Sequence, residues 1–137
     1  WDNKTSGTTV NLSGVTYGNS TYVIVGNSGT ILTSSDNGTS WDNRTSGTTQ
    51  YLTEVTYGNN IFVSVGSSGT ILTSSDGTTW TSRTSGTTEG LSDVTYGNGF
   101  FVVVGGTGTI LTSPDGTTWT SRTSGTSLSL SGVTSIE

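Results

Sequence analysis

Nine carboxylate and four cationic side chains are the groups in this 137-residue sequence that could take part in acid–base or ionic chemistry. Three of the carboxylates stand in one recurrent motif, with a Ser two residues before the Asp and a Trp within five residues after it. One Asp per loop offers too few oxygen atoms for calcium, which takes about six to eight. We therefore expect each Asp to accept hydrogen bonds from the amides of a tight turn, and the motif to be structural rather than a calcium or sugar site. The three copies are Ser34, Asp36, Gly38 and Trp41; Ser74, Asp76, Gly77 and Trp80; and Ser113, Asp115, Gly116 and Trp119.

The composition excludes several kinds of chemistry. The sequence contains no Cys and no His, which removes thiolate and imidazole catalysis, disulfides and the usual zinc sites. Four cations and a net charge of −5 offer no basic patch, so we expect no nucleic-acid partner and no binding to an anionic membrane. No apolar run is long enough to insert across a bilayer, and we expect no metal and no cofactor.

The positions of the tryptophans reveal a repeated sequence. Trp1, Trp41, Trp80 and Trp119 are spaced by 40, 39 and 39 residues, and each is followed by the block TSGT. The first spacing is longer because Asn37 stands between the Asp and the Gly of the motif. Residues 1–137 are therefore predicted to form a single repeat domain, with three full units and a partial fourth.

Each unit contains four short extended segments, which in the first unit lie near residues 10–17, 21–26 and 30–34 and from Trp41 onward. β-Branched and aromatic residues fill these segments, and the Gly, Asn and Asp between them are typical of hairpin turns. No apolar pattern has a 3.6-residue period, so we expect essentially no helix. The pattern predicts an all-β fold, a β-propeller with blades of four antiparallel strands. We expect about three blades plus terminal half-blade strands, with a β-solenoid as the alternative.

The stretch SSDNGTSW fits the pattern Ser-x-Asp-x-Gly-x-Thr/Ser-Trp through Ser34, Asp36, Gly38, Ser40 and Trp41. In this the chain resembles the Asp-box, or bacterial-neuraminidase-repeat, β-propellers. The second and third copies lack the residue between Asp and Gly, as in repeats of bacterial secreted proteins and of photosystem II assembly-factor-like propellers. The resemblance implies that each motif is a hairpin between the third and fourth strands of a blade, with the Trp buried between neighbouring sheets.

Sialidases share this motif, but the four cations argue against their chemistry. Lys4, Arg44, Arg83 and Arg122 all stand three residues after the Trp, on the last strand of each unit, so they cannot converge on one carboxylate. No paired-carboxylate or nucleophile–base motif is present, so we expect no enzyme. We instead expect each cation to pair with a carboxylate or carbonyl of the neighbouring blade, with the Asp of the motif as the first candidate.

In a repeat fold, the positions that differ between copies are candidates for binding. Tyr51, Glu54 and Asp93 stand at or just before the first strands of their units, so a polar ligand or cation could meet them at the central channel. A solvated acidic channel is the alternative interpretation. Glycosylation motifs are present at Asn3, Asn11, Asn19, Asn37 and Asn43.

Three blades do not close a ring, because propellers have about four to eight. We therefore expect the chain to be part of a longer one, or to form a homo-oligomer or polymer through its open blade ends. Residue 1 is not Met, so we expect a processed product or a segment, located outside the cell or at its surface. The predicted function is a non-enzymatic extracellular structural or interaction module. A lectin-like propeller that binds glycans through Tyr17, Tyr57 and Tyr96 is the alternative, and a sialidase-like hydrolase is the least favoured.

Overall fold

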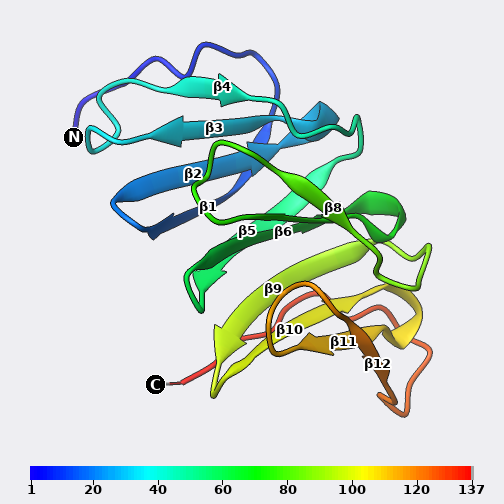
Figure 1. Cartoon of the computed structure of the whole chain (residues 1–137). Helices are drawn as coiled ribbons and strands as arrows, with labels where there is room; N and C mark the ends of the chain where they lie inside the picture. The colour runs from blue at the N-terminus through cyan, green and yellow to red at the C-terminus, as the bar shows by residue number, and fades with distance from the viewer. Residues whose placement is uncertain (137) are drawn as a thin grey trace.

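The computed structural model describes residues 1–136, and its strands form three four-stranded antiparallel sheets that follow one another along the chain (Figure 1). In each sheet the strands lie in sequence order, so each sheet is one blade. The prediction of an all-β propeller fold with four-stranded blades is confirmed. Blade 1 contains β1 (Leu12–Gly18), β2 (Thr21–Gly26), β3 (Ile31–Ser34) and β4 (Asp42–Arg44). Blade 2 contains β5 (Leu52–Gly58), β6 (Ile61–Gly66), β7 (Ile71–Ser74) and β8 (Thr81–Arg83). Blade 3 contains β9 (Leu91–Gly97), β10 (Phe100–Gly105), β11 (Ile110–Ser113) and β12 (Thr120–Arg122).

The turns inside each blade follow from residues that tolerate a positive φ. Asn19 and Ser20 join β1 to β2 with φ of 49° and 59°, as a two-residue hairpin with the right-handed twist of its strands requires. The second and third strands are joined by a single 3₁₀ turn, at Asn27–Gly29 in blade 1, and Ser28 at its centre has φ of 57°. Among residues 1–136 the helical elements are these single 3₁₀ turns. None of them is long and apolar enough to cross a membrane.

The hydrophobic core lies between blades rather than inside them. Val23, Val25 and Ile31 on one side of blade 1 pack against Leu52, Val55, Phe62 and Leu72 on the facing side of blade 2. The next boundary repeats this arrangement, with Val63, Val65 and Ile71 against Leu91, Val94, Phe101 and Leu111. Because side chains alternate across a strand, β6 contributes Phe62 to one core and Val63 and Val65 to the other.

Hydroxyl groups join the inner strands of adjacent blades. Each inner strand has a register shift near its start, between Leu12 and Gly14 in β1 and between Leu52 and Glu54 in β5. The residue at the shift turns its hydroxyl toward the next blade: Ser13 Oγ donates to the Leu52 carbonyl at 2.6 Å, and Thr53 Oγ1 to the Leu91 carbonyl at 2.7 Å. These bonds fix how far one blade is displaced against the next.

The two outer sides of the stack differ from the boundaries inside it. Leu12 and Val15 of blade 1 are 38% and 59% exposed, whereas Leu52 and Val55, at the same repeat positions, are 0% and 3% exposed. On the other side, residues 130–135 lie beside β9 of blade 3. There the Leu130 amide donates to the Gly105 carbonyl at 2.9 Å and Ser135 Oγ donates to the Tyr96 carbonyl at 3.0 Å. This segment follows the path that the inner strand of a further blade would take.

Candidate functional site

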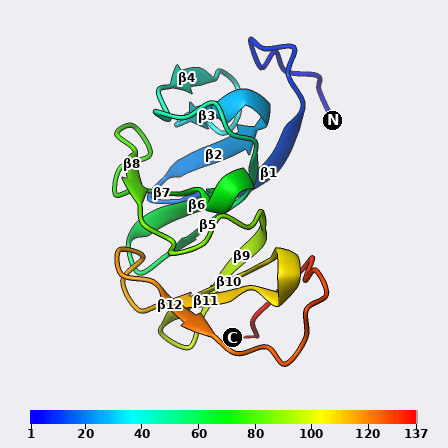
Figure 2. The same cartoon turned by 90° about the vertical axis from the view of Figure 1, so that its right-hand side faces the viewer.

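Two hollows lie where the second-to-third-strand turn of a blade meets the loop that leads into the next blade, and a third lies along the loop that leads into blade 1. The turns of all three blades gather on one side of the molecule, which faces the viewer in Figure 2. One hollow, of about 630 Å³, lies between the 3₁₀ turn of blade 1 and residues 43–49. A second, of about 590 Å³, is lined by Gly69 and residues 83–88, and a third, of about 650 Å³, by residues 4–9. We call this side of the molecule the loop face.

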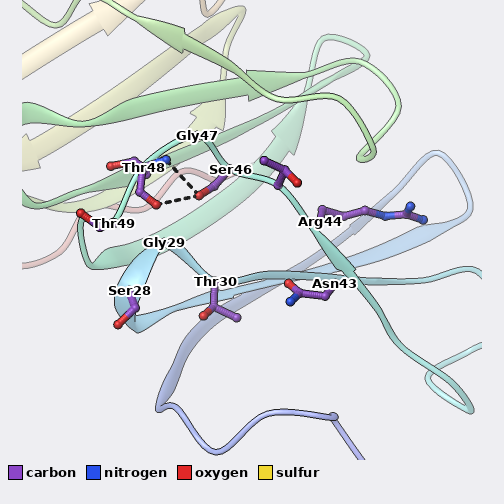
Figure 3. A pocket seen from close by; sticks show the side chains of 10 residues that line it. Ser28, Gly29, Thr30, Asn43, Arg44, Ser46, Gly47, Thr48 and Thr49 are labelled. Atoms are coloured by element: carbon purple, nitrogen blue, oxygen red, sulfur yellow. Dashed lines mark hydrogen bonds between the residues drawn. The ribbon is translucent and has the colours of Figure 1, made fainter.

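The TSGT block forms one wall of each hollow and is held by its own turn. Ser46 Oγ donates to the Thr48 carbonyl at 3.1 Å, and the Thr48 amide donates back to Ser46 Oγ at 3.3 Å (Figure 3). Gly29 of the 3₁₀ turn lies directly against this loop, since a Cβ at Gly29 would overlap the Thr48 carbonyl oxygen. The same contact recurs at Gly69 with Thr87 and at Gly108 with Thr126. Sequence reasoning used TSGT only as a marker of the repeat and missed its role in shaping this surface.

The hollow beside blade 1 is polar and its walls are fixed. Ser28, Thr30, Asn43, Thr48 and Thr49 present hydroxyl or amide groups around it (Figure 3). Arg44 lines its edge, but the guanidinium extends away from the Ser46–Thr49 loop. The hollow can therefore offer hydrogen bonds to a polar, extended ligand without a charge at its centre.

The cations bind within their own blades, so the predicted pairing with a neighbouring blade is wrong for the arginines. Arg44 Nε donates to Thr33 Oγ1 at 2.8 Å, Arg83 Nε to Thr73 Oγ1 at 2.8 Å and Arg122 Nε to Thr112 Oγ1 at 2.9 Å. The one ion pair among residues 1–136 joins Arg44 to Asp42 of the same strand at 3.5 Å. The physical reason is register, because Arg44 stands opposite Ile31 in the ladder and its side chain reaches Thr33 on the same side.

The structure separates the three side chains predicted to face a ligand at the channel. Tyr51 is 42% exposed just before β5. Glu54 accepts from the Val55 amide at 3.0 Å and lies against Gly14 of blade 1. Asp93 accepts from the Val94 amide at 2.8 Å and from the Val133 amide at 2.9 Å. Both carboxylates thus bind backbone amides, and Glu54 also lines a hollow of about 410 Å³ beside Leu12 and Val15. A ligand-binding role for the three side chains stays a prediction from the sequence.

Burial controls the protonation of Glu54. Desolvation raises the pKa of this half-buried carboxyl group, the Val55 amide offsets part of that rise, and the negative charge of Asp93 adds to it. The raised pKa means that ionising Glu54 costs more in the folded chain than in water.

The Asp motifs form hydrogen-bonded hairpins between the third and fourth strands. In the first copy, Asp36 accepts from the Ser40 amide at 2.9 Å, from the Ser40 hydroxyl at 2.6 Å and from the Ser34 hydroxyl at 2.7 Å. The Ser40 hydroxyl, the Ser40 amide and the Ser34 hydroxyl lower the pKa of Asp36 from 3.8 to about 2. Trp41 Nε1 donates to the Gly38 carbonyl at 3.1 Å, which ties the ring to the turn.

The shorter second and third copies use different donors. Asp76 accepts from the amides of Thr78 and Thr79 at 2.8 and 3.0 Å. The hydrogen bonds from Thr79 and Thr78 are the main causes that lower the pKa of Asp76. The Thr118 and Thr117 amides do the same for the pKa of Asp115. Trp80 and Trp119 pack against the cores between blades 1 and 2 and between blades 2 and 3, respectively.

The five asparagines of the predicted glycosylation motifs, Asn3, Asn11, Asn19, Asn37 and Asn43, are all exposed. Asn43 also lines the hollow beside blade 1, so a glycan there would cover part of the loop face. Modification at these positions stays a prediction from the sequence.

Comparison with known proteins identifies the fold. No family model matches the sequence, and no curated protein matches it. Among solved structures, YCF48 bound to a D1 peptide superposes with a TM-score of 0.71 at 21% identity, covering 84% of this chain and 40% of the other. YCF48 from Cyanidioschyzon merolae superposes with a TM-score of 0.67 at 19% identity, covering 80% and 36%. The chain therefore has the propeller fold of these proteins and spans less than half of their length.

These structures overturn the function predicted from the sequence. One of these propellers is recorded with a bound D1 peptide. The predictions of an extracellular structural module, of a homo-oligomer or polymer formed through open blade ends, and of glycan binding are therefore wrong. Of the three tyrosines of the lectin alternative, Tyr17 is 54% exposed, whereas Tyr57 and Tyr96 lie with ring centroids 4.6 Å from Phe62 and Phe101, respectively. Rings engaged in this way are not free to stack on a sugar.

Proposed function

We infer that this chain is a propeller segment that binds an extended polypeptide along its loop face, without catalysing a reaction on it. The observation that carries this proposal is that a hollow lies along the TSGT loop at three successive units of the repeat. A polypeptide is a ligand with hydrogen-bonding groups at regular intervals, so it can use equivalent hollows one after another. The similar propeller with a bound D1 peptide supports this class of partner.

The walls of the hollows suit such a ligand. The TSGT loops and the 3₁₀ turns hold each other in place, so little ordering is required when a ligand binds. Thr49 and Thr88 are exposed at the margins of two hollows, and Tyr51 adds an exposed aromatic ring to the same side of blade 2. Exposed aromatic rings and hydroxyls are common in surfaces that bind peptides.

The experiment is a peptide array screened with the purified chain, followed by fluorescence anisotropy on the strongest peptide and on the D1 peptide of the YCF48 complex. Thr49→Trp and Thr88→Trp fill two hollows without touching the core and should weaken binding roughly tenfold or more each, since a lost buried contact typically costs over about 1 kcal/mol. Thr39→Trp is the matched control, because Thr39 is exposed on the Asp36 hairpin and lines none of the three hollows. Absence of any peptide that binds better than its scrambled form, or equal loss in Thr39→Trp, would refute the proposal.

Three finer assignments belong to the same proposal. We assign the Ser-Asp-Gly-Trp hairpins to the Asp-box class, on the support of the Asp36 hydrogen bonds and the Trp41 contact. We also propose that residues 1–137 act as one repeat domain, because each boundary core takes side chains from two blades. An extracellular location stays a prediction from the sequence, and peptide binding does not depend on it.

A further inference from the structure

A smaller cavity lies at the rim, between blades 2 and 3, and it shares one lining residue, Arg83, with the hollow of residues 83–88. Its volume is about 220 Å³. Blade 2 contributes β7, β8 and the turn between them, and blade 3 contributes its Asp hairpin. The residues that matter for its chemistry are Ile61, Thr73, Thr81, Arg83, Asp115 and Thr117. We call it the rim cavity.

Arg83 enters the rim cavity in a fixed orientation. Its Nε donates to Thr73 Oγ1 at 2.8 Å, and Thr73 is 4% exposed within the blade. This bond leaves the two terminal nitrogens of the guanidinium without a hydrogen-bond partner in the described part of the chain. A planar guanidinium held at Nε presents a pair of donors that matches a carboxylate.

Asp115 supplies the opposite charge on the other wall. Its Oδ1 accepts from the Thr117 and Thr118 amides at 2.8 and 3.1 Å and from Ser113 Oγ at 3.1 Å. The amides of Thr118 and Thr117 lower the pKa of Asp115, so it is ionised at neutral pH. Its Oδ2 has no hydrogen-bond partner among residues 1–136.

Arg83 and Asp115 line one cavity but do not form an ion pair within 4.0 Å. The equivalent arginine of blade 1 differs, because Arg44 has the carboxylate of Asp42 at 3.5 Å. Blade 2 carries Thr81 at the position of Asp42, so Arg83 lacks this partner. At the boundary between blades 2 and 3, the positive charge of Arg83 and the negative charge of Asp115 therefore line one cavity without forming an ion pair.

We propose that the rim cavity binds a small zwitterion of the α-amino-acid class. The ligand's carboxylate pairs with the terminal nitrogens of Arg83, and its ammonium group binds Oδ2 of Asp115. Thr81 and Thr117 add hydroxyls, and Ile61 gives an apolar contact for a short side chain. The ligand would connect blade 2 to blade 3 across a boundary that has no ion pair of its own.

The test is a ¹H–¹⁵N NMR titration of the whole chain with L-alanine at millimolar concentrations, following the Thr117 and Thr118 amides and the indole N–H of Trp119. Saturable shifts should be confined to these groups and to the Arg83 Nε–H. N-acetyl-alanine lacks the ammonium group and alaninamide lacks the carboxylate. Each should bind roughly tenfold or more weakly, since a hydrogen bond to a charged group typically contributes that much.

Two substitutions separate the proposal from a loss of folding. Thr81→Asp recreates the arrangement of Asp42 and Arg44, so it should abolish the shifts while the remaining spectrum is unchanged. Asp115→Asn should weaken binding by a similar factor, and Asp36→Asn, at the equivalent hairpin of blade 1, is the matched control, because no residue of that hairpin lines the rim cavity. Absence of saturable shifts, equal binding of N-acetyl-alanine, or undiminished binding in Thr81→Asp would overturn the proposal. Thr81 and Asp115 line none of the three hollows, so either outcome leaves peptide binding on the loop face to be judged separately.

Discussion

Replacement of Thr53 by Val tests whether hydroxyl bonds between inner strands hold the blades together. Thr53 Oγ1 lies 2.7 Å from the Leu91 carbonyl of blade 3 and 3.1 Å from the Val65 carbonyl of its own blade. A hydroxyl carries one hydrogen, so the shorter contact, which crosses the boundary, is the stronger bond. Valine keeps the shape of the side chain and removes this donor.

The expected cost combines two effects. The lost hydrogen bond contributes about 0.5–1.5 kcal/mol net, and a carbonyl left without its donor costs about 1 kcal/mol or more. We therefore expect Thr53→Val to lower the free energy of unfolding by about 2 kcal/mol, or roughly thirtyfold in the equilibrium constant. Because the bond joins two blades, the loss should also make unfolding less cooperative across this boundary.

Urea unfolding followed by tryptophan fluorescence measures both quantities, since Trp80 and Trp119 pack on the two sides of blade 2. Thr56→Val on the same strand is the control, because the Thr56 hydroxyl makes no hydrogen bond with any residue among 1–136. This control should change the stability by less than about 0.5 kcal/mol. If Thr53→Val and Thr56→Val had the same stability, the blades would be held by apolar packing alone and our reasoning would fail.

Three further predictions concern acid stability, the buried carboxyl group and the core. The pKa of Asp36 is about 2 in the folded chain against an ordinary value of 3.8, so its contribution to the free energy of unfolding is complete above the ordinary pKa and is lost as pH falls toward 2. Asp36→Asn should therefore reduce the fall of the urea midpoint between these pH values. An unchanged slope of midpoint against pH would contradict this prediction. Glu54 has the opposite sign, because its raised pKa favours the protonated form when folded. Glu54→Gln should raise the thermal midpoint at pH 7, and this gain should disappear as pH falls through the raised pKa. Phe62→Ala should cost about 3–5 kcal/mol in urea unfolding, since Phe62 is 0% exposed between two blades, whereas Tyr22→Ala at the half-buried equivalent should cost less than half of that.

Much of the fold follows from local rules that the sequence obeys three times. The first strand, expected near 10–17, runs from Leu12 to Gly18, and the second occupies Thr21–Gly26 where 21–26 was expected. Turn chemistry explains this agreement, because Asn and Gly at hairpin centres accept a positive φ at little cost. The 3₁₀ turn at Asn27–Gly29 was expected only as a turn, since its tight form depends on packing against the TSGT loop.

The candidate site was less predictable, because it depends on which side of a strand a residue faces and what lies opposite. The sequence gives no sign that Asp93 accepts from the Val133 amide, forty residues away in the chain. The arginines were expected to reach the neighbouring blade, but the ladder register directs them to a Thr of the adjacent strand. The TSGT block marks one wall of each hollow, but the rim cavity has no sequence motif, because it is assembled from strands and a hairpin of two different repeats.

The sequence by itself determined the repeat, the four strands of each blade, their turns and the hydrogen-bonding residues of the Asp hairpins, because all of these depend on residues within a few positions of one another. Only the tertiary structure decided what equivalent residues do. Leu12 and Leu52 share a repeat position, yet one is 38% exposed and the other 0%, since only Leu52 has a blade before it. Arg44 and Arg83 also share a position, yet one has a carboxylate partner and the other faces a cavity. Burial and pairing are properties of the boundary between two blades, and a single repeat contains only half of that boundary.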